Sequence, residues 1–293
     1  MSWTAPAFTV VRAILAVGGI IVAVVLALKI ALLALEPRLT FYPVRGYFDA
    51  PAAAGLPFED VFLSTEDGVR IHGWFIPAGE KTRGGTASPL TLLFFHGNAE
   101  NIGGCLDLAA LTRGAGYNLL LLDYRGYGQS DGRPSEAGLY RDGDAALKYL
   151  RAREGVDPSR IVVWGRSIGA AVAVHLAADD ADATPLAGLI LESAFTSALD
   201  LLKTGGHWAL YAAARFGTYR FDSAARMARV TTPVLIVHGT DDGIAPISLG
   251  RRLYDRAPGR KEIVAIRGGG HNDLLPLHAD ELWGAVRRFL SSL

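Results

Sequence analysis

The sequence is poor in cysteine and has no excess of charge of either sign. Its 293 residues include a single cysteine, Cys105, so an internal disulfide is excluded and cysteine usage does not identify the cellular compartment. Lys plus Arg and Asp plus Glu number 29 each, a formal net charge of zero. Because a nucleic-acid-binding surface needs uncompensated basic residues, no nucleic acid is expected as a partner. Neither H-E-x-x-H nor C-x-x-C occurs, so neither a metal site nor a cofactor is expected.

One long apolar run lies near the N-terminus. It begins at Ala13, ends at Leu35 and contains one charged residue, Lys29. A helix of this length spans roughly 35 Å, enough for a ~30 Å hydrocarbon core, and Lys29 is close enough to the end to reach the interface. A cleaved signal peptide would be shorter and followed closely by a small-residue cleavage site. The sequence therefore predicts a single-pass membrane anchor over residues 1–36, in contact with the lipid bilayer; the few flanking basic residues do not decide its orientation.

The rest of the chain is organised as one domain behind a connecting segment. Residues 37–57 are rich in Pro, Ala and Gly without a period, which predicts a linker. Residues 58–293 begin with an expected antiparallel hairpin and continue as short apolar runs that alternate with helical stretches. This alternation predicts an α/β fold with a mostly parallel central sheet and helices on both faces. The expected strands after the hairpin are 91–95, 118–122, 161–164, 186–191, 233–237 and 262–266, and the expected helices are 102–113, 135–153, 168–178, 199–216, 248–256 and 279–290.

Two segments match the G-x-S-x-G pattern of a serine-hydrolase elbow, GQSDG around Ser130 and GRSIG around Ser167. The nucleophile of an elbow lies on a sharp turn directly between a strand and a helix. Ser167 follows the apolar run RIVVW and precedes IGAAVAVHLAA, whose small residues favour a helix packed on a sheet. Ser130 is separated from its strand by YRGYG, and Pro134 delays the next helix. The context predicts Ser167 as the nucleophile and Ser130 as a loop serine.

Candidates for the base and the acid follow Ser167 in the order Asp then His, each after its own expected strand. His271 comes after EIVAI and a flexible RGGG, and Asp242 comes after PVLIVHG. A neutral histidine has to take the serine proton, and a carboxylate has to fix the histidine tautomer. Two other carboxylates compete for the role of the acid: Asp241, which is adjacent to Asp242, and Glu192, which ends the strand LILE.

An oxyanion hole needs two backbone N–H groups that point to the place where negative charge develops. Ile168, directly after the nucleophile and at a helix N-terminus, is expected to supply one. The loop HGNAENIGG after strand 91–95 is expected to supply the other, from Asn98. The alternative is that this loop is an ordinary Asn/Gly turn.

Taken together, LLFFHGNAENIG, LLLDYRGYGQSDG, VVWGRSIGAA, ESAFTS, PVLIVHGTDDGIAP and GGGHND resemble the alpha/beta-hydrolase superfamily. More narrowly, they are similar to membrane-anchored serine hydrolases grouped with the yeast bud-emergence proteins and animal protein depalmitoylases, which often carry a serine-aminopeptidase-like label. The resemblance implies an alpha/beta-hydrolase fold with a small cap over residues 193–232. It also implies Ser167 as nucleophile, Asp242 as acid through its G-x-x-D spacing, and His271 as base, with the Asn98 and Ile168 amides as oxyanion donors.

The function predicted from the sequence is cleavage of a carboxylic ester or thioester through an acyl-enzyme on Ser167. The expected substrate is a small-molecule or lipid-like acyl ester or thioester. Peptide hydrolysis, as the aminopeptidase-like label suggests, is the alternative within the enzyme class. A membrane-bound scaffold that has kept the fold but lost turnover is the alternative outside it, and the complete Ser, Asp and His set argues against that alternative.

Overall fold

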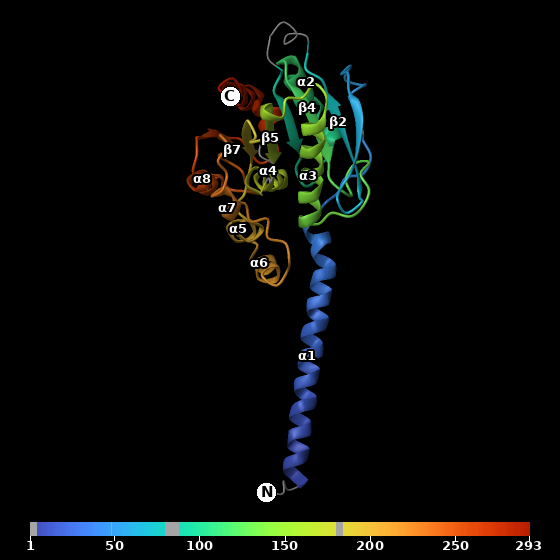
Figure 1. The fold of residues 1–293 in the computed structure, drawn as a ribbon. Coiled ribbons are helices and arrows are strands. Elements are labelled where there is room, and N and C mark those ends of the chain that lie inside the picture. The colour runs from blue at the N-terminus through green and yellow to red at the C-terminus, as the bar shows by residue number, and fades with distance from the viewer. Residues whose placement is uncertain (1–4, 48, 80–87, 180–183) are drawn as a thin grey trace.

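An eight-stranded sheet forms the centre of the folded part of the chain (Figure 1). The computed structural model describes residues 5–47, 49–79, 88–179 and 184–293. The strand order is β1-β2-β4-β3-β5-β6-β7-β8; β2 runs antiparallel to β1 and β4, and every other neighbouring pair is parallel. The mostly parallel sheet predicted from the alternating pattern is thus confirmed. The strands are β1 (Glu59–Ser64), β2 (Arg70–Ile76), β3 (Thr91–Phe95), β4 (Asn118–Asp123), β5 (Ile161–Arg166), β6 (Gly188–Glu192), β7 (Val234–Gly239) and β8 (Lys261–Ile266).

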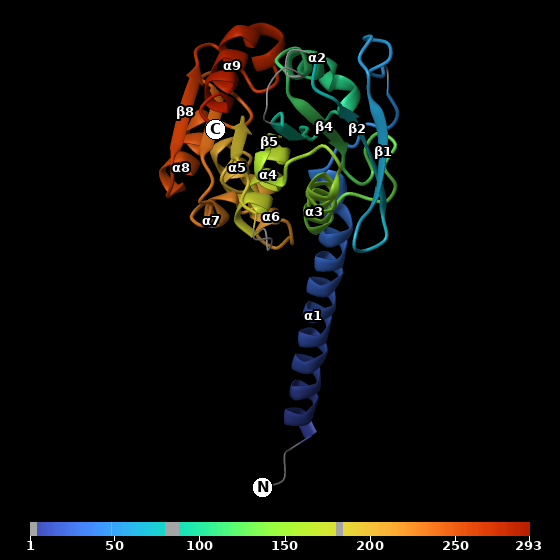
Figure 2. The same ribbon diagram turned by 45° about the horizontal axis from the view of Figure 1, so that its top comes forward.

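Helices cover both faces of this sheet (Figure 2). One face packs against α3 (Glu136–Ala152), α4 (Ile168–Asp179) and α8 (Ile247–Arg256), and the other packs against α2 (Leu106–Gly114) and α9 (Leu274–Leu290). All five residues of β3 are buried because alternate side chains enter opposite cores: Leu93 and Phe95 join the first cluster, and Leu92 and Phe94 the second. A nearly continuous apolar sequence therefore fits β3, since neither face of this central strand meets water.

The N-terminal helix α1 (Ala5–Thr40) extends away from the sheet domain in both views (Figures 1 and 2). At ~1.5 Å per residue its length is about 54 Å. From Thr9 to Thr40 it is long and apolar enough to cross a membrane, although a signal sequence near an N-terminus meets the same test. Pro37 lies inside the helix without ending it.

The segment predicted as a linker, residues 37–57, is largely attached to the domain. The helix continues through the first four of these residues to Thr40, and Phe41 is only 3% exposed. Arg45 pairs with Gly128 in an isolated parallel bridge, and Asn101 Nδ2 donates to Val44 O at 3.3 Å. The abundance of Pro and Ala in residues 37–57, which led to the prediction of a linker, did not reveal these long-range contacts.

The helix boundaries differ from the predictions in three places, all in the C-terminal half. The single helix expected over 199–216 is two helices, α5 (Ala198–Thr204) and α6 (Trp208–Ala214), because Gly205 and Gly206 intervene and Gly206 adopts φ +76°. A five-residue helix, α7 (Ser223–Met227), was not predicted. Helix α9 begins at Leu274 rather than 279, because a kink at His278 separates a first turn from the predicted part.

Candidate active site

Ser167 lies on a strained turn between β5 and α4. Its φ is +54°, a left-handed conformation that is rare for a residue with a side chain. A Cβ on Gly165 would overlap the backbone of Gly169, and a Cβ on Gly169 would overlap the carbonyl of Phe95 in β3. The backbone N–H of Ser167 donates to Glu192 O at 2.9 Å, which ties the turn to β6. Both glycines of the pattern are therefore required by close backbone approach, and the turn projects the serine hydroxyl beyond the edge of the sheet.

His271 lies between Ser167 and Asp242. Its Nε2 is 2.9 Å from Ser167 Oγ, and its Nδ1 is 2.8 Å from Asp242 Oδ2. The three residues follow β5, β7 and β8, so the carboxyl ends of parallel strands bring them to one edge of the sheet. The other oxygen of Asp242 accepts from the backbone N–H groups of Ile244 and Ala245, at 3.0 and 2.7 Å. These two bonds from the backbone fix the plane of the carboxylate relative to the imidazole.

The carboxylate of Asp242 is ionised in this setting. Burial alone would raise the pKa of Asp242, but hydrogen bonds from His238 and His271 hold that pKa well below its usual range. A permanent negative charge beside His271 Nδ1 favours the tautomer with its proton on Nδ1. That tautomer leaves Nε2 free to accept a proton from Ser167.

The competing residues have other partners. Asp241 is exposed, and its Oδ1 accepts from the neighbouring Thr240 hydroxyl at 2.8 Å. Glu192 is buried and accepts from Arg166 Nε at 2.9 Å and from Trp164 Nε1 at 3.1 Å. Ser130 is buried, where its hydroxyl donates to a strand carbonyl and accepts from a strand amide, each at 2.8 Å. The second G-x-S-x-G match thus lies in a loop and holds that loop against the sheet.

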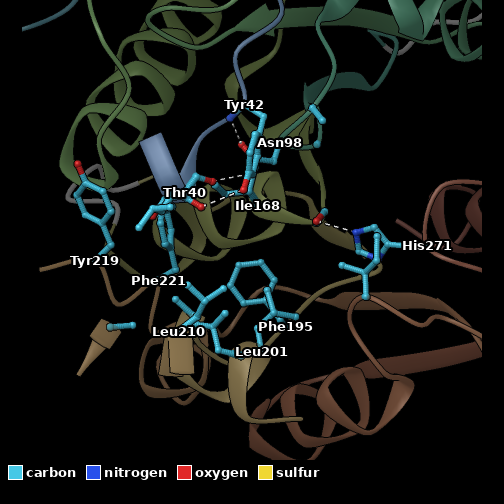
Figure 3. A pocket seen from close by; sticks show the side chains of 18 of the residues that line it. Thr40, Tyr42, Asn98, Ile168, Phe195, Leu201, Leu210, Tyr219, Phe221 and His271 are labelled. Atoms are coloured by element: carbon cyan, nitrogen blue, oxygen red, sulfur yellow. Dashed lines mark hydrogen bonds between the residues drawn. The ribbon is translucent and has the colours of Figure 1, made fainter. Parts of the chain in front are cut away.

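Asn98 and Ile168, whose amides are expected to form an oxyanion hole, are both among the residues that line one cavity with Ser167 and His271 (Figure 3). Among the described residues, neither the N–H of Asn98 nor that of Ile168 has a hydrogen-bond acceptor. The Asn98 side chain is held by three bonds: from the Tyr127 hydroxyl at 2.7 Å, from the Tyr42 N–H at 3.2 Å, and to Thr40 O at 2.7 Å. Thr40 is the last residue of α1, and Tyr42 lies two residues beyond it. The Asn98 loop is therefore positioned by residues that sequence reasoning assigned to a linker.

An ion-pair network that includes two lining residues, Arg166 and Glu100, supports this loop. Arg166 bonds Glu192 and also lies 3.2 Å from Glu100, whose carboxylate accepts from the Gly97 N–H at 2.6 Å. Burial opposes the charged form of Arg166, but both carboxylates raise its pKa, so the guanidinium stays charged. In the described part of the chain, no group of three or more His, Cys, Asp or Glu side chains is arranged to hold a metal ion.

A cavity of about 610 Å³ extends from Ser167 and His271 between α5, α6 and α1 (Figure 3). The volume falls within the ~300–1,000 Å³ usual for small-molecule sites. Most of its lining is apolar. Sequence reasoning missed the residues that α1 contributes, since nothing local connects them with the elbow: Leu32, Glu36, Leu39 and Thr40. Further apolar lining residues come from the chain between β6 and α7, which includes α5 and α6: Phe195, Ala198, Leu201, Leu202, Leu210, Ala213, Ala214, Tyr219 and Phe221.

Comparison with known proteins agrees with this fold. Residues 91–232 match the sequence profile described as the alpha/beta hydrolase fold. The chain is 34% identical over 293 residues to the alpha/beta hydrolase domain-containing protein WAV2 of Arabidopsis thaliana, covering 93% of this chain and 92% of that one. It is 39% identical over 209 residues to the human alpha/beta hydrolase domain-containing protein 17C, covering 70% of this chain and 59% of that one.

Solved structures show the same fold at lower identity. The esterase Pf2001 of Pyrococcus furiosus superposes with a TM-score of 0.69 at 21% identity, over 86% of this chain and 97% of the esterase. An acetyl xylan esterase from a Paenibacillus species superposes with a TM-score of 0.63 at 20% identity, over 88% and 98% of the two chains. The fold, the extent of these matches and the elbow show that the chain belongs to the alpha/beta hydrolase family.

Proposed function

We propose that this hydrolase is a membrane-anchored serine enzyme that cleaves a carboxylic ester or thioester through an acyl-enzyme on Ser167. The observation that carries the proposal is the continuous hydrogen-bonded series from Asp242 through His271 to Ser167, with separations of 2.8 and 2.9 Å. A nucleophile, its base and the group that orients the base need these distances. Solved structures with the same fold include esterases, which agrees with this class of reaction.

In the first half-reaction, Ser167 Oγ forms a bond to the substrate carbonyl carbon while its proton passes to His271 Nε2. The N–H groups of Asn98 and Ile168 bind the oxyanion of the tetrahedral intermediate. The carbon–oxygen or carbon–sulfur bond to the leaving group then breaks, and His271 returns the proton to that group. In the second half-reaction, water gives its proton to His271 and attacks the acyl-enzyme, and Ser167 regains its proton as the acid leaves.

The lining of the cavity favours an acyl chain over a peptide. An aminopeptidase needs an unpaired carboxylate for the substrate's ammonium group. The described lining contains two carboxylates, and both have partners: Glu100 pairs with Arg166, and Glu36 accepts from Thr218 and Tyr219. The remaining wall consists mainly of leucine, alanine and aromatic side chains, which suit a hydrocarbon chain.

Membrane attachment is the second part of the proposal. The anchor comprises residues 1–36, with the apolar run from Ala13 to Leu35 in the bilayer, and the hydrolase domain comprises residues 58–293 with its cap at 193–232. The length of α1 and the exposure of its apolar side chains support the anchor. The expected result is that the full chain sediments with membranes and resists carbonate extraction. A chain shortened by about thirty residues in the cell would mean that the run is a cleaved signal.

Fluorophosphonate labelling of the full chain in membranes tests the nucleophile. Ser167→Ala should abolish labelling and reduce turnover of a small ester at least about a thousandfold, as removal of a triad residue does. Ser130→Ala is the matched control from the second G-x-S-x-G. It should keep its labelling, although loss of a buried hydroxyl with two partners should lower the stability by ~1–3 kcal/mol. Labelling that survives Ser167→Ala and disappears in Ser130→Ala would refute the assignment.

A further inference from the structure

Helix α6 and the loop that follows it carry large apolar side chains that are largely exposed. Trp208, Leu210 and Phe216 are 61%, 45% and 66% exposed and lie within nine consecutive residues. The Trp208 ring also meets the Tyr211 ring edge-on, with centroids 6.1 Å apart. A tryptophan, a tyrosine and a phenylalanine grouped on a small protruding element are typical of contact with the membrane interface.

Two side chains of α1, Lys29 and Glu36, bond to the loop that directly follows α6. The Lys29 ammonium donates to Phe216 O. Glu36 accepts from the Thr218 N–H at 2.6 Å, the Thr218 hydroxyl at 2.7 Å and the Tyr219 N–H at 3.0 Å. Lys29 and Glu36 are seven residues apart, about two turns, so they lie on the same side of α1. The cap is therefore held beside α1, as both views of the ribbon show (Figures 1 and 2).

The position of Lys29 sets the depth of the cap relative to a bilayer. Sixteen residues separate Arg12 from Lys29, and none of them is charged. Such a stretch rises ~24 Å, so side chains that reach outward at each end complete a hydrocarbon thickness of ~30 Å. Lys29 then marks the edge of the hydrocarbon, and its partner Phe216 lies at the same level. The exposed side chains of α6 are thereby placed at the interface and not in bulk water.

The cavity lies between α1 and the cap on this same side. Leu32, one turn beyond Lys29, lines it together with Leu39. Leu201 and Leu210 line it from α5 and α6 (Figure 3). Because Leu210 is both a lining residue and an exposed one, the apolar lining continues onto the outer surface of α6.

We propose that α6 lies in the interface of the bilayer that α1 crosses, and that the cavity loads laterally from this bilayer. Its substrate is a membrane-dissolved lipid with a single acyl chain in ester or thioester linkage. The acyl chain enters along Leu210 and Leu32 while its carbonyl reaches Ser167. This inference rests on the proposed hydrolase function and on membrane insertion of α1, and it adds the surface through which the substrate arrives.

The depth of α6 is measured first, without reference to activity. The full chain, with its single buried cysteine replaced (Cys105→Ala), is labelled with an environment-sensitive fluorophore at Trp208→Cys or Phe216→Cys and reconstituted in phosphatidylcholine–phosphatidylglycerol vesicles. Leu277→Cys on α9 is the matched control, because Leu277 is 74% exposed and belongs to a different helix. Lipids carrying a nitroxide near the headgroup should quench the labels at 208 and 216 strongly and the label at 277 weakly. Equal, weak quenching at all three positions would overturn the proposal. Energy transfer between labelled copies without nitroxide quenching would also overturn it, because α6 would then face a second copy of the chain and not the lipid.

Lateral loading is measured by comparing two substrates. Trp208→Ser combined with Phe216→Ser should slow hydrolysis of a long-chain ester dissolved in the vesicles by at least about fivefold, because apolar side chains at the interface provide the contact. Hydrolysis of water-soluble nitrophenyl acetate should be unchanged, since neither side chain lines the cavity. Leu277→Ser should affect neither rate. Unchanged hydrolysis of both substrates, or an equal loss on both, would refute lateral loading. If the wild-type chain hydrolyses neither ester, the proposed function fails, and the quenching experiment still decides the position of α6.

Discussion

Replacing Asp242 by asparagine tests the electrostatic arrangement around His271 most directly. Asp242 uses its two oxygens differently: Oδ1 accepts from the backbone N–H groups of Ile244 and Ala245, and Oδ2 faces His271 Nδ1. An asparagine must keep its carbonyl oxygen toward the two backbone donors, because its NH₂ group cannot accept from them. The NH₂ group is then forced toward His271.

The expected consequence is a change of tautomer. An NH₂ group donates to Nδ1 and so places the imidazole proton on Nε2, which can no longer accept a proton from Ser167. Turnover of a small ester should fall about ten-thousandfold, equivalent to ~5.4 kcal/mol of transition-state stabilisation. The fold should be retained, because both backbone bonds to position 242 remain. Steady-state kinetics with nitrophenyl acetate, together with a circular dichroism spectrum, measure the two effects separately.

Two neighbouring carboxylates serve as controls. Asp241→Asn alters an exposed group that contacts only Thr240 among its described side-chain partners, and the rate should change by less than about tenfold, as for other surface substitutions. Glu192→Gln weakens the bonds to Arg166 and Trp164, so it should lower Tm. It should leave kcat nearly unchanged. A large loss of turnover in Glu192→Gln combined with a small loss in Asp242→Asn would refute the assignment of the acid.

Two further predictions concern contacts at the edges of the site. Tyr127→Phe removes the 2.7 Å bond to Asn98. It should lower kcat by about twofold to tenfold with little change in KM, since one such bond contributes ~0.5–1.5 kcal/mol. Unchanged kcat would mean that the remaining bonds suffice to hold the loop. Glu36→Leu leaves the Thr218 N–H and hydroxyl without their acceptor, so limited proteolysis should cut the cap faster than in the wild type, whereas the exposed Arg38→Leu should not alter the cleavage rate. Equal cleavage rates for the two variants would argue against a role for Glu36 in holding the cap.

The features that could be predicted from the sequence are those whose determinants lie close together in the chain. The strand, the two glycines and the small-residue helix around Ser167 occupy one continuous segment, so the elbow was recognisable before any long-range contact was known. The mostly parallel sheet followed from apolar runs whose two faces are both buried. The break between α5 and α6 also had a local signal, the pair Gly205 and Gly206, which the apolar pattern around it outweighed.

No local sequence signal showed that α1 contributes residues to the cavity. Leu32 and Leu39 are part of an apolar run that looks the same whether its side chains meet lipid or a ligand. Glu36 bonds Thr218 and Tyr219, which lie 182 and 183 positions further along the chain. Thr40 bonds a side chain 58 positions away. Contacts over such separations depend on how the cap and the sheet are packed, and no periodicity in the sequence reports that packing.

The direct continuation of α1 into the domain has a consequence for the kinetics of the enzyme. A catalytic domain on a flexible tether samples a volume whose radius grows with the square root of the tether length. Here the helix runs to Thr40 and Phe41 is already buried, so no such tether follows α1. With α1 in a membrane, Ser167 would move in a plane at constant height and search in two dimensions. Its rate would then follow the number of substrate molecules per unit of surface, and inert lipid added at constant total substrate would slow it by dilution alone.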